Sequence, residues 1–139
     1  MTTKRPDRIV EPPFAARSFL PEAVFSEDVV MVTGGSSGMG RGMALAFAQG
    51  GAKLVIVGRD LEKAQGVVAE IEAMSEKAVA VSADVRDPAA VSAAFDAAEA
   101  ALGPVSILAN NAGGNFPALA EALSTNAWNA ITRIAIDGT

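Results

Sequence analysis

Short apolar runs alternate with amphipathic segments from residue 29 to residue 139. The apolar runs predict four strands, at Val29–Thr33, Lys53–Val57, Ala78–Val81 and Ser106–Ala109. The segments that follow them predict four helices, at Gly38–Gln49, from Asp60 to about Met74, from Asp87 to about Leu102, and from about Thr125 towards Asp137. The runs are continuously apolar rather than alternating, which indicates a parallel sheet buried on both faces. The pattern therefore predicts an α/β fold, a doubly wound (Rossmann-like) parallel sheet.

Capping residues support these helix boundaries. Gly50-Gly51 should end the first helix. Asp60 should cap the second, and Asp87 followed by Pro88 should begin the third. One face of the second helix is apolar, through Leu61, Ala64, Val67, Val68 and Ile71. The last helix has an apolar face that four strands would leave partly uncovered, formed by Trp128, Ile131, Ile134 and Ala135.

Residues 1–27 lack a period of 2 or 3.6 and include four prolines, Pro6, Pro12, Pro13 and Pro21. We expect an extended N-terminal arm lying over the domain of residues 28–139. Its possible anchors are Phe14, Phe19, Leu20 and Phe25.

The amino-acid composition argues against several classes of function for this chain. Half of the 139 residues are hydrophobic, enough for one domain with a core. Without cysteine or histidine, the chain has no thiolate or imidazole ligand for a metal, and we expect no metal site. The net charge of -5 and the scattered basic residues argue against a nucleic-acid partner. No apolar run approaches a membrane span, and no secretory signal is present, so we expect a cytoplasmic protein.

The segment Thr33-Gly34-Gly35-Ser36-Ser37-Gly38-Met39-Gly40 joins the first strand to the first helix. Glycines there allow a tight turn, close approach of a ligand, and close packing of helix and strand. The N–H groups at the helix start would then face a pyrophosphate. An ordinary tight turn is the alternative. A P-loop is excluded because no Gly-Lys-Ser/Thr follows the turn.

Arg59 follows the second strand, where a cofactor with a free ribose 2′-hydroxyl usually meets an acidic side chain; Gly58 occupies that place. A guanidinium suits a 2′-phosphate, so NADP is favoured over NAD. The alternative is that Arg59 is a solvated surface charge and Asp60 only a helix cap.

Polar residues also follow the third and fourth strands. Asp84, in Ala83-Asp84-Val85, could accept a hydrogen bond from an adenine amino group, or be one more loop carboxylate. The segment Asn110-Asn111-Ala112-Gly113-Gly114-Asn115 would lie at the same edge of the sheet, as a cofactor contact or a structural turn.

Together these motifs resemble the short-chain dehydrogenase/reductase family, in their order and spacing, from about Val29 to Thr139. The pattern consists of Thr33-Gly34-x-x-x-Gly38-x-Gly40, Asp84-Val85 and Asn110-Asn111-Ala112-Gly113. Three segments resemble the 2,4-dienoyl-CoA reductase branch: Asn111-Ala112-Gly113-Gly114-Asn115-Phe116, Asn126-Ala127-Trp128 and Asp137-Gly138-Thr139.

The resemblance implies hydride transfer from NADPH to an enoyl or carbonyl small molecule, acyl-CoA included. It also implies a homodimer or homotetramer when the chain is full length. The cofactor-binding residues that we expect are Gly34, Ser36, Ser37, Gly38, Met39, Gly40, Arg59, Asp84, Val85, Asn111, Ala112 and Gly113.

In the family a Ser, a Tyr and a Lys three residues after that Tyr perform the chemistry, on and after the fifth strand. This sequence stops at Thr139 and contains no tyrosine, so we assign no catalytic residue. We expect a truncated chain holding the first four strands only. The family's supporting Asn corresponds to Ala135, and Asp137 is either a supporting or a solvent-facing residue. The alternative function is an inert nucleotide-binding fragment or interaction module.

Overall fold

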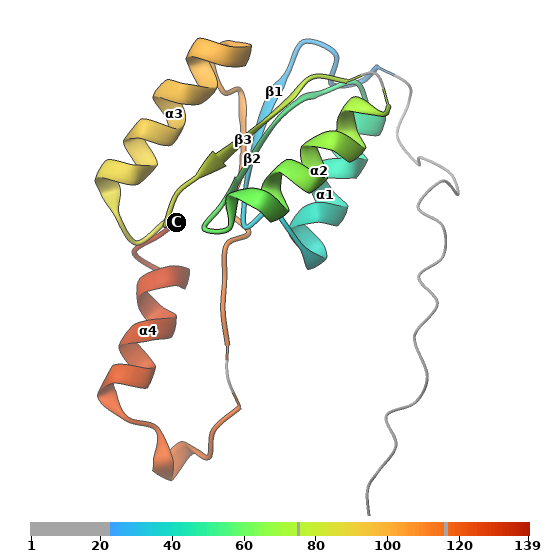
Figure 1. Cartoon of the computed structure of the whole chain (residues 1–139). Coiled ribbons are helices and arrows are strands. Elements are labelled where there is room, and N and C mark those ends of the chain that lie inside the picture. Colours follow the sequence, from blue (N-terminus) through green and yellow to red (C-terminus); the bar gives the residue numbers. More distant parts are fainter. Residues whose placement is uncertain (1–22, 75, 116) are drawn as a thin grey trace, which may run out of the picture.

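The computed structural model describes residues 23–74, 76–115 and 117–139. Within these ranges strands and helices alternate, as the sequence predicts (Figure 1). The elements are β1 (Val29–Thr33), α1 (Gly38–Gln49), β2 (Lys53–Gly58), α2 (Leu61–Glu72), β3 (Ala78–Ser82), α3 (Pro88–Leu102), β4 (Ile107–Ala109), the short 3-10 helix η1 (Ala120–Ala122) and α4 (Thr125–Ala135). The predicted α/β class and parallel sheet are confirmed.

The four strands form one parallel sheet in the order β3-β2-β1-β4. β1 pairs with β2 on one side, with Val30 opposite Leu54, and with β4 on the other, with Val30 opposite Ile107. The chain thus builds outward from β1 first in one direction and then in the other. In open α/β sheets a ligand crevice forms where the direction reverses, at the carboxyl ends of the strands. Here that point lies between β1 and β4.

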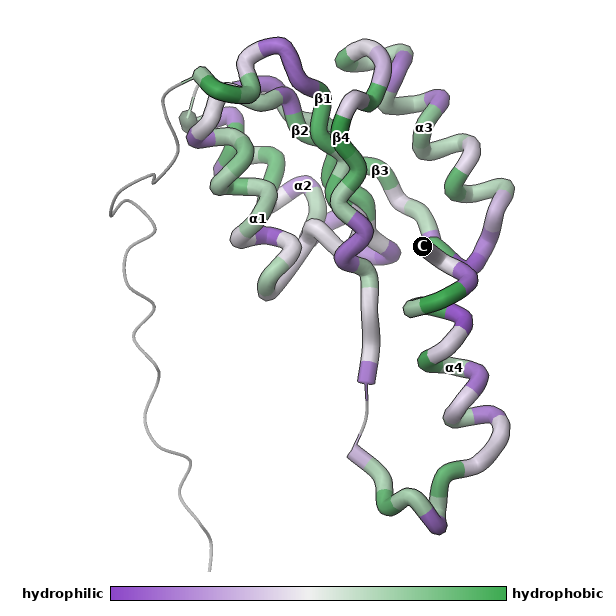
Figure 2. The backbone as a smooth tube through the Cα atoms, turned by 180° about the vertical axis from the view of Figure 1, so that it is seen from behind, coloured by the Kyte–Doolittle hydropathy of each residue, from purple (hydrophilic) through white to green (hydrophobic). Residues whose placement is uncertain are grey.

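Helices cover both faces of the sheet (Figure 1, Figure 2). Alternate residues of a strand point to opposite faces, so each central strand contributes to two cores. Val30 and Val32 pack with α1 and α2, while Met31 packs with α3. All five residues of β1 are buried, which explains its continuously apolar sequence.

Three strand ends differ from the prediction by one residue. β2 and β3 extend to Gly58 and Ser82 because these two residues continue the ladder between the strands. β4 begins at Ile107, although the Ser106 N–H still donates to the Val29 carbonyl oxygen at 3.0 Å.

Two helices end earlier than predicted. α2 ends at Glu72, because the Met74 N–H turns back to the Ile71 carbonyl oxygen in a tighter turn. α4 ends at Ala135. After it, the Asp137 N–H donates to the Thr132 carbonyl oxygen at 3.4 Å, one residue further back than the partner in a regular α-helix.

The predicted apolar face of α2 is wrong at Leu61. Ala64, Val67 and Ile71 are buried and Val68 is half-buried, but Leu61 is 41% exposed. Leu61 is the first residue of α2 and follows the end of β2 at Gly58 by three residues, so it lies at the carboxyl edge of the sheet.

α4 lies beyond the carboxyl ends of the strands rather than over a face of the sheet (Figure 1). None of its residues is buried, and Trp128 is 59% exposed. The partly uncovered apolar face that the sequence predicts is confirmed. No helix in the described part of the chain is long and apolar enough to cross a membrane.

Phe25 anchors the segment before β1 to the end of α1. Its ring packs edge-on against Phe47, with centroids 5.0 Å apart, and its N–H donates to the Gly50 carbonyl oxygen at 2.8 Å. The other predicted anchors, Phe14, Phe19 and Leu20, lie outside the described residues, so the predicted arm stays a prediction.

The Thr33 hydroxyl joins the ends of β1 and β4. It accepts hydrogen bonds from the N–H groups of Asn111 at 3.1 Å and Ala112 at 3.0 Å, and donates to the Ala109 carbonyl oxygen at 3.4 Å. Thr33 is buried, with 7% of its surface exposed. One hydroxyl therefore fixes the loop after β4 against the turn after β1.

Replacing Thr33 with Val should destabilise the protein by about 1–3 kcal/mol, because two backbone N–H groups lose their acceptor. Thr33→Ser keeps the hydroxyl and removes one methyl group, which should cost about 0.8 kcal/mol. Urea unfolding of the two variants compares these costs. Equal losses for Val and Ser would contradict the role given to the hydroxyl.

Replacing Gly50 with Ala should also destabilise the protein, by about 1–3 kcal/mol, because the new Cβ would lie 2.7 Å from Phe25 Cδ2. The matched control is Gly66→Ala in α2, where nothing lies within 4 Å of the new Cβ. That change should stabilise the helix by about 1 kcal/mol. The cost at Gly50 should fall in a Phe25→Ala background, where only the Phe47 carbonyl oxygen remains close to the new Cβ, at 3.3 Å. If urea unfolding shows the cost undiminished there, the clash with Phe25 is not its cause.

Candidate functional site

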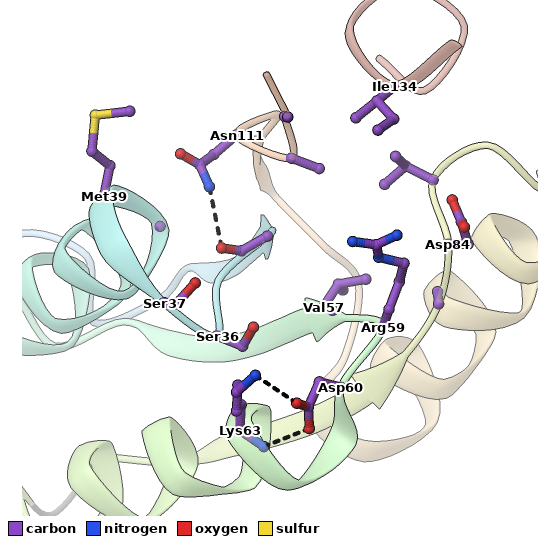
Figure 3. Close-up of a pocket in the computed structure, with 18 of the residues that line it drawn as sticks. Ser36, Ser37, Met39, Val57, Arg59, Asp60, Lys63, Asp84, Asn111 and Ile134 are labelled. Atoms are coloured by element: carbon purple, nitrogen blue, oxygen red, sulfur yellow. Dashed lines mark hydrogen bonds and ion pairs between the residues drawn. The ribbon is translucent and has the colours of Figure 1, made fainter. Parts of the chain in front are cut away.

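An open cleft of about 870 Å³ lies at the carboxyl edge of the sheet, at the predicted crevice (Figure 3). It brings together the segments at the carboxyl ends of all four strands, the starts of α1 and α2, and Ile134 of α4. Eleven of the twelve expected cofactor residues line it: Gly34, Ser36, Ser37, Met39, Gly40, Arg59, Asp84, Val85, Asn111, Ala112 and Gly113. The twelfth, Gly38, is not among the lining residues.

The glycines of the turn after β1 have different tasks. Gly34 and Gly38 have φ angles of +64° and +53°, a region that side chains with a Cβ rarely adopt. A Cβ on Gly38 would meet nothing within 4 Å, so the backbone there faces open space. A Cβ on Gly40 would collide with the Gly34 carbonyl oxygen and lie 2.5 Å from Asn111 Nδ2. Gly40 thus lets α1 begin directly against the loop after β4.

The N-terminus of α1 has no side-chain cap. Its N-cap residue, Ser37, makes no capping hydrogen bond, and its first turn has no acidic residue. The other α-helices of the described part are capped by Asp60, Asp87 and Ser124. The backbone N–H groups that begin α1 are therefore available to an anion in the cleft.

The end of β2 lies against the glycine-rich turn. A Cβ on Gly58 would be 3.1 Å from Ser36 Oγ, so the Ser36 hydroxyl lies directly beside Gly58. The Arg59 side chain points into the cleft on the side of Asp84 (Figure 3). Across the described ranges, no residue forms a hydrogen bond or ion pair with the Arg59 guanidinium. Gly58 and Arg59 thus leave a space bounded by a hydroxyl and a cation.

Asp60 and Lys63 form a pair on the first turn of α2. Lys63 Nζ lies 2.9 Å from Asp60 Oδ2, and the Lys63 N–H donates to Asp60 Oδ1 at 3.2 Å. Hydrogen bonding to Lys63 lowers the pKa of Asp60, and the same contact raises the pKa of Lys63. Asp60 is the helix cap that the sequence predicts, whereas Lys63 in the cleft was not predicted. Lys63 could have been found, since it lies three positions after the predicted cap Asp60, within reach of its side chain on the first turn of the helix.

Asp84 is held by Arg86 in the loop after β3. The Arg86 guanidinium donates from Nε to both Asp84 oxygens, at 2.9 and 3.1 Å, and from Nη2 to Oδ2 at 2.5 Å. The Arg86 N–H adds a fourth contact at 3.0 Å. The side-chain and backbone hydrogen bonds from Arg86, helped by its charge and that of Arg59, lower the pKa of Asp84 to about 2. Asp84 is therefore an ionised hydrogen-bond acceptor throughout the physiological range.

The loop after β4 forms the opposite wall. Asn111 Nδ2 donates to the carbonyl oxygens of Thr33 at 3.0 Å and Gly34 at 3.3 Å, so its side chain braces the turn. Ile134 reaches Gly114, where a Cβ would lie 3.6 Å from Ile134 Cδ1. Ile134 had no sequence signal as a cleft residue, because its position depends on where α4 lies.

Asp137 does not line this cleft. It is exposed and borders a second cavity of about 340 Å³, on the α3 side of the sheet, together with Asn110 and Phe95. Among the described residues, no three Asp, Glu, His or Cys side chains gather to form a metal-binding group.

The cleft has the features of a site for an anionic, extended molecule. One end offers uncapped N–H groups of α1, and the other end offers the Asp84 acceptor beside Val85. Ser36 and Arg59 lie between them (Figure 3).

Comparison with known proteins gives a consistent result. The family model described as short chain dehydrogenase matches residues 28–139. A probable 2,4-dienoyl-CoA reductase of Bacillus subtilis is 38% identical over 110 residues, which are 79% of this chain and 43% of that protein.

Two solved structures extend the comparison. A short chain dehydrogenase from Bacillus anthracis is 43% identical, with a TM-score of 0.76 over 81% of this chain and 47% of that chain. A 3-ketoacyl-(acyl-carrier-protein) reductase from Brucella melitensis, complexed with NADH, is 44% identical, with a TM-score of 0.74 over 80% of this chain and 45% of that chain. The chain thus spans less than half the length of each of these relatives. Because the family model covers residues 28–139 and the fold agrees, this chain belongs to the short chain dehydrogenase family.

Proposed function

We propose that this chain provides the NADP-binding part of an oxidoreductase that transfers a hydride to an enoyl or carbonyl substrate. The observation that carries the cofactor proposal is Arg59, a cation without a hydrogen-bonding partner in the described part of the chain, next to Gly58 at the end of β2. A guanidinium binds a phosphate through paired hydrogen bonds.

The charges of the cleft support NADP over NAD. Two carboxylates lie along the cleft, and each already has its own cation: Lys63 for Asp60, and Arg86 for Asp84. Arg59 is therefore a surplus positive charge. NAD would leave that charge unmatched, whereas the 2′-phosphate of NADP would balance it. No acidic side chain occupies the place of Gly58, where a carboxylate would favour a free 2′-hydroxyl.

The remaining residues fit the rest of the cofactor. The start of α1 would hold the pyrophosphate through Ser37, Gly38, Met39 and Gly40. Asp84 and Val85 would hold the adenine, and the loop of Asn111, Ala112 and Gly113 would border the adenosine. NADPH would supply the hydride, and the chain's own residues bind and orient it.

The substrate proposal rests on the relatives. The Bacillus subtilis protein is named a probable 2,4-dienoyl-CoA reductase, and the Brucella melitensis protein a 3-ketoacyl reductase. An enoyl or carbonyl group on an acyl carrier, such as acyl-CoA, is the substrate class that these names share. We further propose that the full-length protein is cytoplasmic and forms a homodimer or homotetramer. Leu119, Trp128 and Ile136, each more than half exposed, support the association.

A nucleotide-binding module without turnover is the second candidate. The 139 residues contain no tyrosine and no histidine, so neither side chain can act as the general acid.

Removing the Arg59 charge should weaken NADPH binding selectively. Arg59→Ala should raise the Kd for NADPH about 10- to 100-fold, the value of one or two charge-assisted hydrogen bonds, and leave the Kd for NADH within about twofold. The change in cofactor fluorescence on binding measures both dissociation constants. Arg133→Ala is the matched control, because Arg133 is an exposed residue of α4 that is not among the residues lining the cleft. A clear NADH preference that Arg59→Ala leaves unchanged would overturn the NADP proposal.

The 139-residue chain alone should bind NADPH without consuming it. Incubation with an enoyl-CoA or a ketone should give no loss of absorbance at the NADPH band above the buffer rate, because no tyrosine is present. Substrate-dependent oxidation by this chain would rule out the inert module. The intact mass of the natural protein would show whether it is longer than these residues, and the downstream reading frame would show whether a Ser and a Tyr-x-x-x-Lys follow them.

A further inference from the structure

We propose that Arg86 sets the cofactor preference of the cleft from a distance, by pairing with Asp84 and so keeping the Arg59 guanidinium available for the 2′-phosphate. This inference rests on the NADP function proposed above. It makes Arg86 a positioning residue: it is not among the residues that line the cleft, and it acts through Asp84.

Arg86 engages the whole Asp84 carboxylate. Its Nε lies 2.9 and 3.1 Å from the two oxygens, and its Nη2 lies 2.5 Å from Oδ2. The backbone N–H of Arg86 approaches Oδ1 at 3.0 Å, so side chain and backbone hold the same group. Both side chains are about one-third exposed, at 35% and 30%. A paired, forked geometry of this kind fixes the direction of a carboxylate better than a single contact does.

Arg59 is the other cation that acts on Asp84. Its charge contributes to the low pKa of the Asp84 carboxyl, after the contributions of Arg86. Figure 3 shows the Arg59 side chain on the Asp84 side of the cleft. The two arginines therefore compete for one carboxylate, and Arg86 holds it. Without Arg86, Asp84 would be an unpaired anion within the field of Arg59.

Loss of Arg86 should weaken the binding of a 2′-phosphate in two ways. Asp84 would attract Arg59 and turn its guanidinium away from the phosphate position. Asp84 would also repel the phosphate directly, because its charge would no longer be balanced. The other charged groups lining this edge, Asp60 and Lys63, remain paired with each other and do not replace Arg86.

The ratio of the NADH and NADPH dissociation constants tests the inference. Arg86→Ala should lower the preference for NADPH about tenfold, the equivalent of one charge-assisted hydrogen bond. Arg86→Lys, which keeps a cation, should retain most of the preference. Adding Asp84→Asn to Arg86→Ala should restore it, since a neutral amide no longer competes for Arg59. Any weaker hydrogen bonding of the adenine in the Asp84→Asn variant affects both cofactors equally, so it cancels in the ratio.

Folding of each variant is checked by urea unfolding, and Arg86→Gln gives the same comparison if the Ala variant unfolds. An equal fall in affinity for both cofactors would indicate a purely structural role and overturn the inference. So would a ratio that stays low in the double variant. If Arg59→Ala lowers the ratio but Arg86→Ala does not, this inference fails while the NADP proposal stands. If Arg59→Ala leaves the ratio unchanged, the NADP proposal itself fails.

Discussion

The cleft depends on one buried hydroxyl. Thr33 ends β1, and its Oγ1 receives the N–H groups of Asn111 and Ala112 from the chain that leaves β4. These two strands are the neighbours between which the chain changes direction, so the hydroxyl stands at the switch point of the sheet. Asn111 returns the contact by donating to the carbonyl oxygens of Thr33 and Gly34. Because the two walls of the cleft are bonded to each other, the space left for a ligand has a fixed width at its base.

Charge placement in the cleft affects recognition more than stability. The pairs Asp60–Lys63 and Asp84–Arg86 are partly exposed, and ion pairs of this kind contribute little to the free energy of unfolding. Their effect is local: in each pair the cation balances a carboxylate that would otherwise repel a phosphate or attract Arg59. The same two aspartates also organise backbone, since each accepts an N–H within three residues.

Sequence patterns were informative wherever backbone geometry decides the outcome. Continuous apolar runs predicted the strands, and Asp60 and Asp87 were confirmed as caps by their hydrogen bonds. The glycine spacing placed the turn. The features that the sequence did not predict depend on which side chains meet in the folded structure. Lys63 and Ile134 reach the cleft from helices. The hydrogen bonds from Arg86 to Asp84 correspond to no sequence motif. Leu61 was wrong because periodicity describes a helix face but not where the sheet beneath it stops.

The placement of β4 links assembly of the domain to ligand binding. The bonds that join it to β1 span 76 to 79 residues of chain, whereas β1, α1 and β2 follow one another directly. Bringing such distant segments together carries a larger loop-closure entropy, so docking of β4 should be among the later folding events. One wall of the cleft, formed by Asn111–Asn115 and Ile134, follows β4 in the sequence and takes its place only with that strand. A nucleotide that contacts both walls would therefore stabilise the pairing of β1 with β4, the strands most distant in sequence. Its binding free energy would add to the stability of the folded domain.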